Sequence, residues 1–187
     1  NFCFINMEAK KITKGKFLIS QPHLEDPNFK RSVVLLLEHN KVESIGCVLN
    51  HYTSIHISEI VKKIPAISSK VSIGGPVDQN ILLYVHQYGE IIPESRKIQE
   101  NIFWGGDFSE IKKAIKQKKI KENKIKFFLG YSGWEANQLK KEIKDNSWIV
   151  YNGKKDLIFN QEKNLWKKHI KSLDEEHSMW INMPENP

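Results

Sequence analysis

The chain has 187 residues, 40% of them hydrophobic, and can bury the core of one domain. It has no run of eighteen apolar residues, so we expect no membrane-spanning helix and no membrane partner. The N-terminal residues lack the basic block, apolar core and small-residue cleavage site of a secretory signal, so we expect a cytoplasmic protein. The two cysteines, Cys3 and Cys47, are too few for a metal cluster, and we predict neither a metal site nor a cofactor.

The formal net charge of +7 permits an anionic partner such as nucleic acid. Of the 29 basic residues only two are arginine, and isoleucine and asparagine are frequent, which is typical of nucleotide bias in a genome. Proteins that read base sequence favour arginine, because its planar guanidinium contacts guanine or phosphate with two hydrogen bonds. The charge alone is therefore a weak indication of nucleic-acid binding.

The first half of the chain alternates short apolar runs with polar turns. Residues 32–38 form a continuous apolar and β-branched run, which predicts a strand buried on both faces. A polar turn follows, and residues 45–49 return the chain, so we predict a β-hairpin. Helical spacing of isoleucine and valine over residues 57–64, ended by Pro65, predicts a helix. Further strands are expected over residues 16–20, 71–75, 82–86 and 98–104.

Residues 127–151 are the most informative stretch. The apolar run at 127–129 predicts a buried strand that ends in a glycine-containing turn. Ser132 and Glu135 have the S-x-x-E spacing of a capping box, which predicts the start of a helix. The helix has an apolar face, and Glu142 lies off that face together with three lysines. Residues 148–151 then predict another strand.

The remaining elements complete an α+β pattern. We predict a helix that begins at Asp107 or Ser109 and ends near residue 118, a last strand at 157–159 and an amphipathic helix over 162–173. Strands that alternate with isolated helices and hairpins favour α+β over a doubly wound parallel sheet. We expect an N-terminal extension (1–14), a single domain (15–173) and a C-terminal tail (174–187), from which Trp180 and Ile181 can dock.

A resemblance to a known family rests on motifs spread over the chain. GYSGW at residues 130–134, followed by Gln138-Leu139, Glu142-Ile143 and NSW at 146–148, resembles the signature of the YqgE/AlgH family of bacterial proteins. Earlier blocks fit in order: GKFLIS, FKRSVVLLLEH, IGCVLN and GGPV. The resemblance implies a bent mixed, mostly antiparallel sheet approaching a barrel, with helices packed outside. The family is named partly for a member described as a regulator of transcription, and no reaction is generally assigned to it.

Two motifs invite a catalytic or ligand-binding interpretation. Ser132 follows a strand as in a nucleophile elbow, but Trp134 stands where that motif needs glycine, and many members of the family carry alanine in place of the serine. A helix cap is therefore favoured, and we predict no catalytic residue. The Gly74-Gly75-Pro76 turn presents backbone amides but lacks the Lys-Ser/Thr ending of a phosphate loop, so a structural turn is favoured.

Two sets of cations are candidates for anion binding. Arg31 precedes the buried strand, which suggests a need for the fixed geometry of guanidinium toward a buried carboxylate, a carbonyl or an anionic ligand. The densest basic segment holds eight lysines between Lys112 and Lys126, without interleaved aromatic residues, and a solvated helix face is favoured. The candidate nucleic-acid patch is Lys112, Lys113, Lys116, Lys118, Lys119 and Lys121.

Three functions stay open. The leading hypothesis is a non-enzymatic regulatory or interaction protein, acting in gene expression, whose unidentified protein partner binds a surface of family-motif residues. The alternative is an enzyme or sensor for a small anionic metabolite, with a pocket near Arg31, His39 and the Gly-Gly-Pro turn. The third is direct nucleic-acid binding through the lysine patch, which salt would weaken. The candidate partner or ligand residues are Arg31, His39, Asn50, Gly74, Gly75, Pro76, Trp134 and Gln138.

Overall fold

The structure is a computed structural model that describes residues 11–65, 67–162, 164–171, 173 and 179–182. It combines one ten-stranded sheet with four helices among the described residues, which confirms the α+β prediction. The strands are β1 (Phe17–Ser20), β2 (Val33–His39), β3 (Glu43–Val48), β4 (Tyr52–His56), β5 (Lys70–Ile73), β6 (Val77–His86), β7 (Arg96–Gln99), β8 (Ile102–Trp104), β9 (Ile125–Glu135) and β10 (Trp148–Tyr151). The helices are α1 (Ile57–Ile60), α2 (Phe108–Lys116), α3 (Gln138–Lys144) and α4 (Leu165–Lys171).

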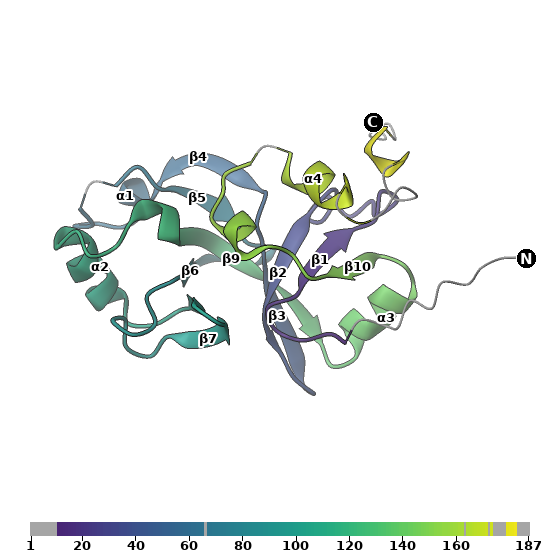
Figure 1. Cartoon of the computed structure of the whole chain (residues 1–187), viewed down its shortest axis with the longest axis horizontal. Coiled ribbons are helices and arrows are strands. Elements are labelled where there is room, and N and C mark those ends of the chain that lie inside the picture. The colour runs from purple at the N-terminus through teal and green to yellow at the C-terminus, as the bar shows by residue number, and fades with distance from the viewer. Residues whose placement is uncertain (1–10, 66, 163, 172, 174–178, 183–187) are drawn as a thin grey trace, which may run out of the picture.

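The sheet is bent and mostly antiparallel, and it is not closed into a barrel. Its main path runs β10-β1-β2-β3-β9-β6-β8-β7, and β5 adds to β9 in parallel and carries β4 at its other side. The β9 strand therefore has three partners, β3, β6 and β5, and runs between the end of the molecule that holds α1 and α2 and the end that holds α3 (Figure 1). Because β9 joins both ends, its residues position the surfaces described below.

Three hydrophobic clusters fill the space between sheet and helices. Phe127 and Phe128 are adjacent on β9 and fully buried, and they belong to two different clusters because successive strand residues point to opposite faces. The same alternation divides β2, whose Val33, Leu35 and Leu37 join one cluster while its even-numbered neighbours join another. This confirms that the run at 32–38 is buried on both faces.

The helix predicted after the GYSGW motif does not begin where the capping box of Ser132 and Glu135 predicts. The β9 strand continues to Glu135, and Ser132 is a fully buried strand residue whose hydroxyl donates to the Gly74 carbonyl at 3.0 Å. The α3 helix starts at Gln138 after Asn137, which has a left-handed backbone with φ 64°. The S-x-x-E spacing is therefore incidental, because pairing of β9 with β3 holds this segment extended.

Several predicted boundaries also change. The helix at 57–64 is the short α1, and residues 98–104 form the β7–β8 hairpin rather than one strand. The segment predicted as a strand at 157–159 is a 3₁₀ helix (Lys155–Ile158). The strand β4 has no counterpart in the sequence prediction, and it forms because β5 pairs with it. The predicted cap of α2 is confirmed, since the Asp107 carboxylate accepts from the Ser109 amide at 2.8 Å.

The ends of the chain are described only in part. Residues 179–182 form a short 3₁₀ helix, and Trp180 packs against the cluster beneath α4, so the predicted docking of this side chain is confirmed. The Ile181 side chain, the predicted extension up to residue 10 and most of the predicted tail lie outside the described residues. No helix in the described part of the chain combines the length and apolar character needed to cross a membrane.

Candidate functional site

The family motifs converge at the α3 end of the sheet. Antiparallel pairing places Ser44 of β3 opposite Trp134 of β9, and the β2–β3 hairpin brings His39 next to Ser44. The Ser44 hydroxyl lies 2.7 Å from Nδ1 of His39. Strand pairing therefore brings His39 and Trp134 to opposite sides of Ser44, although 94 residues of sequence separate them.

Glu142 on α3 is the centre of a hydrogen-bond network beneath this surface. Its Oε2 accepts from the indole N–H groups of Trp134 and Trp148, both at 2.8 Å, and its Oε1 accepts from the Gln138 amide at 2.9 Å. The two indole rings meet edge to face at 6.0 Å, and each is 3% exposed. Trp134, one of the predicted contact residues, is thus a buried support rather than a surface that a partner can reach.

The placement of Glu142 corrects the sequence analysis, which set it off the apolar face among lysines. It is half-buried because the buried indoles need an acceptor, and a carboxylate oxygen serves both. The available signal was its four-residue spacing from Gln138, which places both side chains on one side of the helix.

Removing the charge of Glu142 tests this network. The amide oxygen of Glu142→Gln can still accept from both indoles, but these two bonds become weaker neutral ones, and the amide NH₂ cannot accept from Gln138. We therefore expect the free energy of unfolding to fall by about 1 kcal/mol. Urea unfolding followed by tryptophan fluorescence measures it. Lys141→Gln, an exposed change on the same helix, is the control, and equal losses in both variants would contradict a structural role for Glu142.

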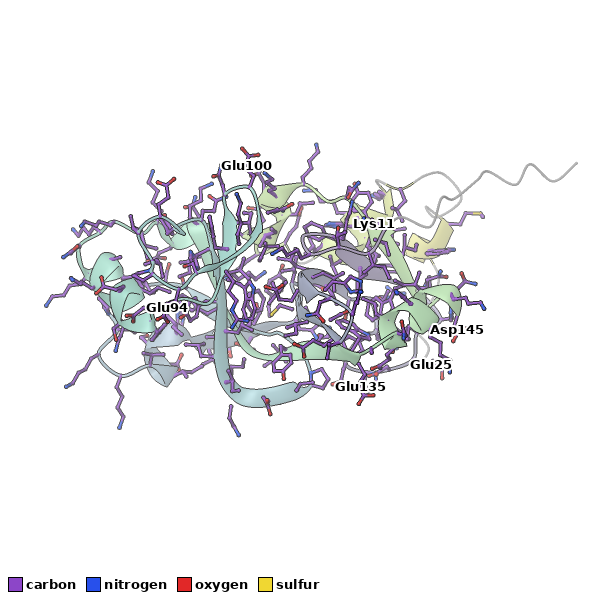
Figure 2. The ribbon with its side chains drawn as sticks, turned by 90° about the horizontal axis from the view of Figure 1, so that it is seen from below. Lys11, Glu25, Glu94, Glu100, Glu135 and Asp145 are labelled. Carbon is purple, nitrogen blue, oxygen red and sulfur yellow. The ribbon has the colours of Figure 1, made fainter. Side chains whose placement is uncertain are left out.

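The open part of this site is a small polar pocket of about 20 Å³. It is lined by His39, Asn40, Lys41, Glu43, Ser44, Glu135, Asn137, Leu139 and Lys140. Figure 2 shows Glu135 at the surface on the α3 side. The lining thus includes two acidic residues, Glu43 and Glu135, and two lysines, Lys41 and Lys140. Partial burial, with a smaller contribution from Lys140, lowers the pKa of His39, so the imidazole is neutral at neutral pH and can both donate and accept.

An apolar side chain stands beside this pocket. Val42, at the turn of the β2–β3 hairpin, is 73% exposed. The turn is ordered by Asn40, whose side-chain oxygen accepts from the Val42 amide at 2.7 Å and the Glu43 amide at 3.0 Å. An exposed apolar residue held by a fixed turn, next to hydrogen-bonding groups of both charges, is suited to contact another protein.

Two other candidates, Arg31 and Asn50, have structural roles at the opposite end of β2. The Arg31 guanidinium lies over the Trp166 ring at 5.3 Å, and Arg31 has a left-handed backbone with φ 50°. Asn50 holds this turn, since its amide donates to the Arg31 carbonyl and its oxygen accepts from the Val33 amide, each at 2.9 Å. The other arginine, Arg96, lies over Trp104 at 5.0 Å, so both guanidiniums stack on indoles.

The Gly-Gly-Pro turn is a point of close contact between two backbones. A Cβ atom on Gly74 would lie 2.3 Å from the Gly130 carbonyl oxygen, and one on Gly75 would lie 2.3 Å from the Tyr131 carbonyl. The Gly74 carbonyl accepts from the Val48 amide at 2.8 Å as well as from Ser132. The glycines of GGPV and GYSGW therefore pack against each other, and the amides do not form an open anion-binding nest.

The pocket proposed for an anionic metabolite is not assembled. Arg31 precedes β2 and His39 ends it, and the seven residues of this strand span about 23 Å at ~3.3 Å per residue. The Gly74 and Gly75 backbone is buried. Arg31, His39 and the Gly-Gly-Pro turn therefore do not line one site, because an extended strand holds two of them apart.

One lysine of the basic segment belongs to the core instead. Lys126 on β9 is 5% exposed, and its ammonium donates to the Leu49 carbonyl at 2.6 Å and lies over the Tyr52 ring at 5.0 Å. Burial lowers the pKa of Lys126 to about 7, against a smaller opposing effect of Cys47. The sequence prediction counted it with the surface lysines because strand alternation within a lysine-rich run was not resolved.

His86, at the end of β6, is a further buried histidine. His86 is fully buried and makes local hydrogen bonds, with Nε2 2.9 Å from the Gly105 carbonyl and Nδ1 accepting from the Tyr88 amide at 3.1 Å. The Ser95 hydroxyl also lies 3.3 Å from Nε2, so the imidazole is held by local hydrogen bonds. Within the described ranges, no three side chains of His, Cys, Asp or Glu are grouped as ligands of a metal ion.

Comparison with known proteins places this arrangement in a family. The family model described as AlgH-like matches residues 17–178. A protein of Bacteroides thetaiotaomicron named UPF0301 protein is 37% identical over 177 residues, 94% of this chain and 90% of its own length. One of the same name from Cytophaga hutchinsonii is 35% identical and spans 94% of this chain and 98% of its own length. The chain belongs to the AlgH-like family.

Solved structures show the same fold. The solution structure of the AlgH protein from Pseudomonas aeruginosa matches with a TM-score of 0.73 and 25% identity, covering 92% of this chain and 95% of that one. A crystal structure of a protein from Corynebacterium diphtheriae matches with a TM-score of 0.75 and 19% identity, covering 92% and 93%. The bent, open sheet is therefore shared by distant proteins.

Proposed function

We propose that the protein is a non-enzymatic interaction protein whose partner-binding surface is the α3 end of the sheet. This α3-end surface consists of the β2–β3 hairpin turn with Val42, the rim residues His39, Glu43 and Glu135, and Lys140 of α3. The partner is another protein, and the interaction serves regulation, with gene expression as one setting.

The proposal rests on one observation: some motif residues support the surface from below, and others are exposed on it. Trp134, Gln138 and Trp148 each donate a hydrogen bond to Glu142, and these bonds fix the position of β9 and α3. Above them stand charged groups of both signs and the 73% exposed Val42. The two indoles of this network are buried, Glu142 is half-buried and Gln138 is exposed. A partly buried network that supports a rim of mixed charge around an apolar residue is the pattern of a small protein-binding surface.

The chemistry of the surface favours a peptide or protein over a small ligand. The pocket has a volume of only about 20 Å³, whereas pockets that bind drug-sized molecules measure roughly 300–1,000 Å³. Neutral His39 can donate and accept, and Lys41 and Lys140 can meet carboxylates while Glu43 and Glu135 meet amines.

Substitutions at exposed positions test this function without disturbing the core. We expect Val42→Glu and Lys140→Glu each to reduce the amount of bound partner at least tenfold, a loss of about 1.4 kcal/mol of binding free energy or more. The measurement is quantitative affinity capture from the native host with wild type and variants. Ile81→Glu, at a side chain that is 51% exposed on β6, is the matched control.

The supporting result is a protein retained by wild type and by Ile81→Glu but lost from both α3-end variants, with unchanged melting temperatures. Purification of that protein and titration against the same four chains then gives the affinity directly. Identical sets of retained proteins for all four chains would overturn the assignment of this surface.

A further inference from the structure

The positive charge of the protein is concentrated at the end of the molecule opposite α3. We define the basic end as residues 57–65, 67–70 and 107–124, which include α1 and α2. These residues hold ten lysines and four acidic residues, a formal charge of +6, whereas the whole chain carries +7. Elsewhere lysines and acidic residues nearly balance, so genomic bias toward lysine does not explain the excess here.

The acidic residues of the basic end are all engaged within the chain. Glu59 accepts from the His56 amide at 2.7 Å, Asp107 caps α2, and Glu122 accepts from the Ser68 amide at 3.1 Å. Glu110 pairs with Lys113 at 3.5 Å, and within the described ranges the other nine lysines of the basic end make no ion pair. The lysines therefore present uncompensated charge to solvent.

The two segments form one continuous surface, although 36 residues separate them in sequence. Ile57 and Ile64 belong to the same hydrophobic cluster as Ile111 and Ile115, so α1 and α2 cover one core. The hydrogen bond between Ser68 and Glu122 joins them at the surface. Figure 1 shows α1 and α2 together at one end, and in Figure 2 long side chains with nitrogen tips project outward there. Lys62, Lys63, Lys70 and Lys124 thus extend the six-lysine patch predicted from sequence.

We propose that the basic end binds the phosphate backbone of duplex nucleic acid without reading its sequence. Lysine ammoniums on long side chains act as point charges, which suit phosphates and do not make the bidentate contacts that identify bases. The basic end contains no arginine. Its aromatic Phe108 lies under Lys112, whose ammonium is 5.7 Å from the ring, so no row of free rings is offered for stacking of single-stranded bases.

The same surface is poorly suited to a membrane. Proteins that lie on anionic bilayers combine basic residues with apolar side chains that enter the lipid. Among the large hydrophobic residues that are exposed in the described part of the chain, only Ile60 belongs to the basic end, and it is 38% exposed. Charge without an apolar face favours a hydrated polyanion over a lipid surface.

Fluorescence anisotropy of labelled duplexes of mixed sequence tests the inference. DNA and RNA duplexes of roughly 20 base pairs are titrated from ~50 to ~200 mM salt. The test variant is Lys62→Gln, Lys63→Gln, Lys70→Gln, which lies outside the patch predicted from sequence. We expect at least tenfold weaker binding and a slope of log K against log salt that is smaller by about 2.7, because each lost phosphate contact removes about 0.9.

The control carries the same change of charge elsewhere: Lys141→Gln, Lys144→Gln, Lys154→Gln, all at exposed positions. It should bind like wild type, while a second test variant, Lys116→Gln, Lys119→Gln, Lys121→Gln, should repeat the loss. Equal weakening in control and test variants, or no binding by wild type at ~150 mM salt, would overturn the proposal. So would equal competition by polyglutamate or anionic vesicles at matched charge. Stronger binding of DNA or of RNA identifies the duplex that is recognised.

Discussion

Gly74→Ala is expected to lower the free energy of unfolding by about 3 kcal/mol, because extra atoms in a close-packed region force the backbone apart. The added Cβ would lie 2.3 Å from the Gly130 carbonyl oxygen and 3.2 Å from the Cys47 sulfur. A backbone carbonyl within the β9 pairing cannot move without loss of strand hydrogen bonds. Denaturant unfolding measures the change, and thermal unfolding should show a fall of roughly 9 °C.

The matched control is Gly133→Ala, the same change in the GYSGW motif that packs against Gly74. Its added Cβ would have its nearest neighbour at 3.5 Å, an ordinary contact, and Gly133 is not among the glycines with positive φ. We expect a change of less than about 1 kcal/mol, since alanine also reduces the entropy of the unfolded chain. Equal losses in the two variants would show that the close approach of GGPV and GYSGW does not constrain the fold.

Lys126→Met is expected to raise stability near neutral pH by about 2 kcal/mol, since a buried cation is replaced by an apolar side chain of similar length. Lys126 titrates near pH 7 in the folded state and at 10.5 when unfolded. Between these values the unfolded chain binds more protons than the folded chain, so the wild type gains stability as pH rises and loses it as pH falls toward 7. Below about pH 7 both states are protonated and this dependence ends.

The difference between wild type and Lys126→Met should therefore shrink by about 2 kcal/mol between about pH 7 and about pH 9, at most ~1.4 kcal/mol per pH unit. Urea unfolding of both chains across this range measures it. The control is Lys124→Met, at a half-buried lysine of the preceding 3₁₀ helix, which removes the same charge. Its free energy of unfolding should differ from that of the wild type by a constant amount across this pH range. A constant difference between wild type and Lys126→Met would mean that Lys126 is solvated in the folded state.

The two proposed surfaces lie at opposite ends of β9 and can be tested by separate experiments. The proposed partner surface lies at the α3 end and is tested by substitutions of Val42 and Lys140, and the proposed duplex-binding surface lies at the α1 and α2 end. Failure of one set of variants leaves the other prediction standing. If both hold, the strand joins a protein-binding end to a nucleic-acid-binding end, which fits a role in regulation.

Prediction from sequence succeeded where the residues of one short segment determine the structure of that segment. The run at 32–38 is apolar at every position but its ends, so any pairing buries it, and β2 is confirmed. Asp107 caps α2 by contacting amides two and three residues away, which is a local interaction. The candidate site was only partly found, because His39 and Trp134 were named but their roles, exposed rim and buried support, were not.

Three errors have one physical cause, which is that partners distant in sequence override local preference. Ser132 has the spacing of a helix cap, yet pairing with β3 and the bond to Gly74 keep it in a strand. The local sequence of Glu142 is that of a solvated helix residue, but two indoles, from β9 and β10, donate hydrogen bonds to its carboxylate. The local sequence of Lys126 is that of a surface lysine, but its position on β9 directs the side chain inward over the Tyr52 ring.

The sequence by itself determined the α+β class, the strongest strands, the cap of α2 and the family to which the chain belongs, because composition, periodicity and motif order do not depend on distant contacts. The tertiary structure decided which motif residues are support and which are surface. It separated Arg31 from His39 along one extended strand, closed the Gly-Gly-Pro turn against Gly130, and gathered lysines of two segments at one end. Each of these follows from strand pairing and shared core packing, which bring together residues that no local pattern connects.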